Sequence, residues 1–113
     1  FRLLGFRSVA CVDQAAAMAA IKAEEHIAGI LVDVVPGHRD SIKFIQKLRQ
    51  QLGPTGLIFT VSNFPSARDL RADLKAAGAT ECFEKPIHAD NFAYIVKLLD
   101  SNDLTAALVK VAA

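Results

Sequence analysis

The sequence has few cysteines, almost no net charge and no long apolar run. Its two cysteines, Cys11 and Cys82, stand alone and match neither a zinc-ligand spacing nor a CxxC motif. Isolated cysteines are typical of a reducing compartment, so we expect a cytoplasmic protein. No run approaches the roughly 18 apolar residues of a membrane span, so no membrane partner is expected.

The charge balance gives no electrostatic basis for binding nucleic acid. There are 13 basic and 12 acidic residues, for a formal net charge of +1. No glycine-rich phosphate loop follows any apolar run, which disfavours a flavodoxin-like domain that binds a small ligand. The chain has 113 residues, of which 52% are hydrophobic, and this predicts one domain with one modest core.

Short apolar runs alternate with stretches of helical periodicity. This alternation predicts a doubly wound parallel sheet between two layers of helices, an α/β fold in three layers. Predicted strands cover 7–12, 29–33, 57–61 and 80–83. Four helices are predicted: one that begins after Asp13, one over the Ile42–Leu52 repeat, one over 67–77 and one that begins near His88. Four strands are therefore visible in the chain.

Three polar residues follow successive predicted strands. Asp33, Ser62 and Lys85 fall at or just after the strand ends, and the carboxyl ends of parallel strands meet at one edge. A carboxylate can act as nucleophile toward phosphorus, while an ammonium and a hydroxyl can stabilise the phosphoryl oxygens. The set therefore predicts a site for phosphoryl transfer.

The segments "GILVDVVPG", "VSN" and "AAGATECFEKP" resemble a response-regulator receiver domain of two-component signalling. The resemblance extends from Gly5 to Leu99 and predicts a flavodoxin-like domain over residues 5–100. Residues 101–113 are predicted to form a short helix or a linker.

The resemblance implies that Asp33 accepts a phosphoryl group from a histidine kinase or a phosphotransfer protein. It implies that Lys85 is the site lysine and that Ser62 is the hydroxyl that turns toward the phosphoryl group. It also implies a Mg²⁺ ion bound by Asp33 and by the backbone carbonyl of Val35. Such a domain is a signalling acceptor with slow self-dephosphorylation rather than an enzyme, and a second copy or an output domain is a further candidate partner.

Several features depart from the family, and one of them is Pro36, which follows Asp33 one residue earlier than in the family. Cys82 stands where the family has a switching aromatic residue, and the acidic pair that ends the family's first strand has no counterpart. Without that pair, Mg²⁺ binding is expected to be weak or lost. The alternative interpretation is a pseudo-receiver, in which the same fold binds a protein partner without phosphorylation.

The family's first strand lies in the centre of the sheet, in the order 2-1-3-4-5, so its place must be filled. The candidates are a segment upstream of Phe1, the tail "LTAALVKVAA" or a partner chain, and a rearranged sheet. If the tail fills the place, it adds no carboxylate pair, and we then expect weak Mg²⁺ binding and poor phosphorylation of Asp33.

Overall fold

Five strands alternate with four helices in the part of the chain that the structure describes. The structure is a computed structural model that describes residues 7–24, 27–34, 39–54, 56–62, 67–84, 88–98 and 107–112. The elements are β1 (Arg7–Cys11), α1 (Gln14–Ala23), β2 (Ile27–Val34), α2 (Arg39–Leu52), β3 (Ile58–Ser62), α3 (Ala67–Ala77), β4 (Glu81–Glu84), α4 (Ala89–Leu98) and β5 (Ala107–Ala112). Each strand and helix predicted from the apolar pattern is present, with shifted ends.

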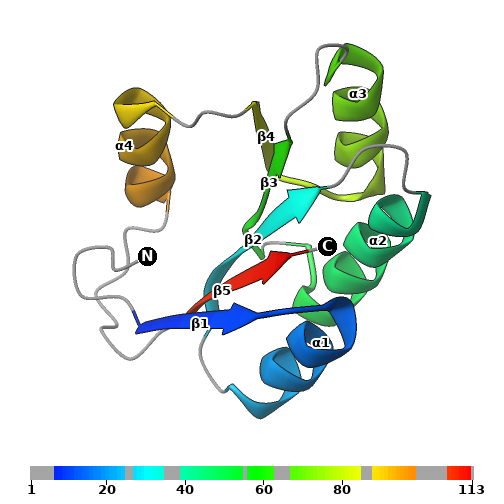
Figure 1. The fold of residues 1–113 in the computed structure, drawn as a ribbon, viewed down its shortest axis with the longest axis vertical. Coiled ribbons are helices and arrows are strands. Elements are labelled where there is room, and N and C mark those ends of the chain that lie inside the picture. The colour runs from blue at the N-terminus through cyan, green and yellow to red at the C-terminus, as the bar shows by residue number, and fades with distance from the viewer. Residues whose placement is uncertain are drawn as a thin grey trace.

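The strands form one parallel sheet in the order β1-β5-β2-β3-β4. Helices α1, α2 and α3 lie on one face of the sheet and α4 lies on the other (Figure 1). The predicted three-layer α/β fold is thus confirmed. The order in which the strands follow one another along the chain differs from that expected for a receiver domain. If the strands are renumbered with β5 first, the spatial order becomes 2-1-3-4-5, the flavodoxin-like arrangement.

The tail of the chain forms β5, an interior strand that lies between β1 and β2. Val109 pairs with Val9 of β1 on one side and with Ile30 of β2 on the other. The prediction of a short helix or linker over residues 101–113 was therefore wrong for 107–112, and the sheet has five strands rather than four. Burial of Leu108 and Val111 outweighs the helix propensity of the neighbouring alanines. Of the candidates for the central place, the tail is the one found there.

Two hydrophobic cores hold the layers together. The larger core lies between the sheet and α1, α2 and α3, and the smaller core lies between the sheet and α4. Fully buried side chains of the larger core include Ile30, Phe44, Ile45, Leu48, Ile58, Leu74 and Val109. In the smaller core, the ring of Phe83 contacts Phe59 and also the exposed Tyr94 of α4. The sheet therefore has apolar contacts on both faces.

The turns at the amino edge of the sheet are tied together by one side chain. The Arg49 guanidinium, near the end of α2, donates hydrogen bonds to the carbonyl oxygens of Gly53 at 2.9 Å, Gly56 at 2.7 Å and Gly78 at 2.6 Å. These carbonyls belong to the turns before β3 and β4. At the edge opposite the predicted site, the turns are thus held together by hydrogen bonds that their backbone carbonyls accept from one partly buried cation.

Candidate functional site

Asp33 lies at the carboxyl edge of the sheet, on a strand with neighbours on both sides. It is the second-last residue of β2, and its Cα is in register with Val61 of β3 and Ala112 of β5. The side chain is half-buried. Because side chains alternate along a strand, Asp33 belongs to the same face as Leu31, the face that α4 covers. The structure thus places the predicted acceptor where a ligand can reach it.

Ser62 lies at the same edge but on the other face. It is the last residue of β3, is buried, and is in register with Val34 and Glu84. It lines a small pocket against α3, and the other residues around this pocket are Arg71, Leu74, Cys82, Phe83 and Glu84. The pleat therefore directs Asp33 and Ser62 to opposite sides of the sheet.

Lys85 and Val35 lie outside the described residues. Each directly follows a strand end, since β4 ends at Glu84 and β2 ends at Val34. Both strands end at the edge that carries Asp33. Their roles in phosphoryl and metal binding stay predictions.

The strand next to Asp33 brings no metal ligand to the site. Ala112 is in register with Asp33, so the backbone register puts an alanine at a position where the receiver resemblance requires a carboxylate. Mg²⁺ prefers carboxylate and other oxygen ligands. Among the described residues, no group of three or more histidine, cysteine, aspartate or glutamate side chains could hold a metal. The residues on β5 therefore do not fit a magnesium site of the receiver type.

A second charged residue lies on the Asp33 face, and the sequence analysis missed it. Lys110 of β5 is exposed, whereas Val109 and Val111 on either side of it are buried in the larger core. Its Cα is in register with Leu31 of β2, two residues before Asp33. The single lysine inside the apolar run "LVKVA" is the signal that could have identified both the strand and its exposed lysine.

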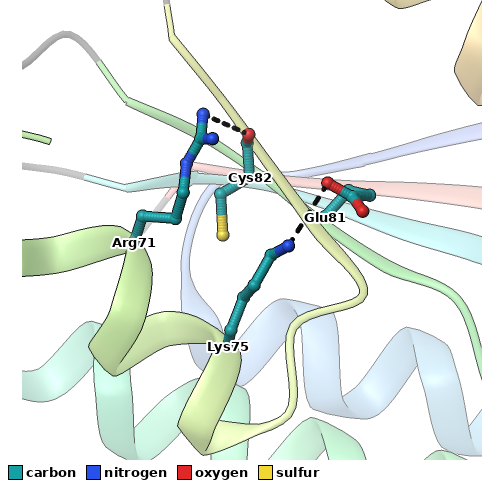
Figure 2. Close-up of polar contacts among 4 residues, drawn as sticks. All are labelled: Arg71, Lys75, Glu81 and Cys82. Atoms are coloured by element: carbon teal, nitrogen blue, oxygen red, sulfur yellow. Dashed lines mark hydrogen bonds and ion pairs between the residues drawn. The ribbon is translucent and has the colours of Figure 1, made fainter. Parts of the chain in front are cut away.

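Two cationic side chains of α3 contact β4, the edge strand next to β3 (Figure 2). The Arg71 guanidinium donates a hydrogen bond to the Cys82 carbonyl oxygen at 3.1 Å, and the Lys75 ammonium lies 3.6 Å from the Glu81 carboxylate. Burial raises the pKa of the Cys82 thiol above its ordinary value, although a hydrogen bond with Thr60 and the nearby cations oppose this shift. The position at which the receiver resemblance expects a switching aromatic thus carries a buried thiol whose pKa burial raises.

Comparisons with protein-family models, with curated proteins and with solved structures gave no match to the chain. Within the described residues, none of the helices has the length and apolar character needed to cross a bilayer. The family resemblance and the function it implies therefore stay proposals that depend on the motifs and on the geometry of the site.

Proposed function

We propose that the chain is a receiver-like signalling domain that accepts a phosphoryl group on Asp33. The observation that carries this proposal is the position of Asp33 between β5 and β3 at the carboxyl edge of the sheet. In a sheet of order 2-1-3-4-5, the strand order reverses between the two strands that correspond here to β5 and β2. Ligands of doubly wound sheets bind at that reversal, outside the carboxyl ends of the strands.

The proposed donor is a phosphohistidine on a kinase or phosphotransfer protein. An oxygen of the Asp33 carboxylate attacks phosphorus, the new P–O bond forms, and the P–N bond breaks with its electron pair left on the imidazole. The product is an acyl phosphate, which water later hydrolyses to restore the carboxylate. The acceptor is thus reset without a second protein.

The two other predicted site residues have distinct proposed roles. Lys85, which follows β4, would place its ammonium beside the phosphoryl oxygens and neutralise part of their charge. Ser62 lies on the α3 side of the sheet, so its hydroxyl would meet a phosphoryl group on Asp33 only around the end of β3. Ser62 would therefore act after phosphoryl transfer and link the phosphorylation of Asp33 to α3. It would not bind the incoming phosphoryl group before transfer.

A second candidate function is favoured by the residue beside Asp33. Ala112 gives no metal ligand, and Cys82 stands at the position of the switching aromatic. Both residues are compatible with a pseudo-receiver, in which the same fold binds a protein partner without being phosphorylated. This candidate differs from the first in one observable, the formation of the acyl phosphate.

The two candidates are separated by incubation with phosphoramidate, whose P–N bond mimics phosphohistidine, in the presence of Mg²⁺. We expect a fraction of the wild-type chain to gain the mass of one phosphoryl group, with a low yield because the tail adds no carboxylate pair, and we expect Asp33→Asn to abolish the gain. The matched control is Asp73→Asn, which alters an exposed aspartate of α3. A folded wild-type chain that gains no mass would contradict phosphorylation and support the pseudo-receiver.

A further inference from the structure

We infer that Lys110 takes the place of a divalent cation at Asp33, so that phosphorylation of Asp33 is independent of Mg²⁺. The inference rests on the proposed function, because it concerns the charge around the same acceptor. It starts from the mismatch between a receiver-type magnesium site and Ala112, the β5 residue that is in register with Asp33.

The register places Lys110 within reach of the acceptor. Lys110 and Asp33 are on adjacent strands and on the same face, offset by two residues, because Lys110 is in register with Leu31. Adjacent strands lie about 4.8 Å apart and each residue rises about 3.3 Å. The flexible four-carbon stem of a lysine can span this diagonal, so its ammonium can contact oxygens of a phosphoryl group held at Asp33.

The surface around Lys110 is open to a phosphodonor. Ala10 of β1, in register with Lys110, is exposed, and Lys110 itself is exposed although β5 lies between two other strands. Strands of parallel α/β sheets are usually covered on both faces and apolar throughout. A charged side chain at such a position differs from this apolar pattern and is not required for the stability of the strand.

The charge balance at the site also favours this role. In the receiver arrangement, a divalent cation offsets the two carboxylates of the first strand and the incoming phosphoryl group. Here the alanine side chain at position 112 carries no charge, and Lys110 contributes one positive charge. A phosphoryl group can thus approach Asp33 with less electrostatic repulsion than in a site with three carboxylates.

The test measures the rate of phosphoramidate labelling of Asp33 by intact mass, once with Mg²⁺ and once with EDTA. Four chains are compared: the wild type, Lys110→Gln, Lys110→Arg and the control Lys22→Gln, which removes an exposed lysine of α1 on the opposite face. Circular dichroism confirms that each variant is folded. We expect equal wild-type rates in both media to within about twofold, and a loss of about fivefold in Lys110→Gln. Lys110→Arg and Lys22→Gln should keep the wild-type rate.

The outcomes distinguish this inference from the proposed function. Labelling of Asp33 that requires Mg²⁺ and is unchanged in Lys110→Gln would overturn the inference and leave the proposed function standing. Equal loss of rate in Lys110→Gln and Lys22→Gln would also overturn it, because the lysine would then act only through net charge. Absence of Asp33 labelling in every arm would overturn both.

Discussion

Ala112 of β5 lies in register with Asp33 of β2 at the carboxyl edge of the sheet. This pairing connects the fold with the chemistry of the site. The strand that completes the sheet comes from the tail of the chain, and its register puts an alanine where the receiver resemblance calls for a metal-binding carboxylate. The proposed acceptor thus lies in register with a residue that has no metal-binding side chain.

Ala112→Asp is expected to create a magnesium site. A second carboxylate next to Asp33 adds an oxygen ligand and a negative charge, both of which Mg²⁺ favours, so we expect binding to tighten by at least about tenfold. Isothermal titration calorimetry with MgCl₂ measures the change. The control is Ala72→Asp on the exposed surface of α3, which should bind as the wild type does. Identical titrations of both variants would contradict the register between β5 and β2.

Val109→Ala should destabilise the fold because Val109 is fully buried in the interior strand β5. Removing two buried methyl groups and leaving a cavity costs about 2 kcal/mol of the free energy of unfolding, measured by urea denaturation. Val12→Ala makes the same chemical change at a side chain that is 83% exposed, and its effect should stay within about 0.5 kcal/mol. Equal effects of the two substitutions would argue against an interior position for β5.

Gly78→Ala should destabilise the chain more than Gly53→Ala. Both glycines have positive φ, 126° at Gly78 and 82° at Gly53, so each substitution strains the backbone by at least about 1 kcal/mol. At Gly78 the new methyl group would also lie 2.8 Å from Cβ of Arg49, whereas nothing lies within 4 Å at Gly53. Urea denaturation of the two variants gives the comparison, and a larger loss at Gly53 would contradict the packing of Arg49 against Gly78.

The stability of the fold should fall when the buried thiols ionise. Burial raises the pKa of Cys11 and of Cys82 above the ordinary value of 9.0, and the charge of Asp13 adds to the shift at Cys11. The folded state therefore retains these protons when the unfolded chain has lost them. The stabilisation is complete below pH 9 and is lost as the pH rises through the folded pKa values.

Urea midpoints measured between about pH 8 and pH 10.5 test this linkage, with each cysteine replaced by alanine in turn. We expect each replacement to reduce the alkaline decline in stability, because it removes one buried thiol that ionises. The lysine and tyrosine side chains are common to all the chains, so they do not affect the comparison. An unchanged decline in Cys82→Ala would show that this thiol is not shielded from water.

The sequence predicts the elements with a clear local pattern better than it predicts the strand β5 that the tail forms. The run before Asp33 and the run before Ser62 are continuous and apolar, as strands covered on both faces require, and both form strands. Asp13 was predicted to begin the first helix, and its carboxylate accepts a hydrogen bond from the Ala16 N–H at 2.7 Å. These features depend on neighbours along the chain.

The features that sequence analysis missed depend on pairing between distant segments. Lys110 interrupts the apolar run of β5, and the adjacent alanines favour a helix, so only pairing with β1 and β2 makes this segment a strand. Similarly, the pattern places Asp33 and Ser62 at one edge of the sheet. Their assignment to opposite faces follows from a register that the individual strands do not encode.

The most direct test of the account is to locate the phosphoryl group on the chain. After incubation with phosphoramidate, borohydride reduces an aspartyl phosphate to homoserine, and tandem mass spectrometry identifies the altered residue. The account predicts homoserine at Asp33 alone. Homoserine at another aspartate, phosphate retained on a histidine such as His88, or an unmodified chain would contradict the assignment of Asp33 as the acceptor.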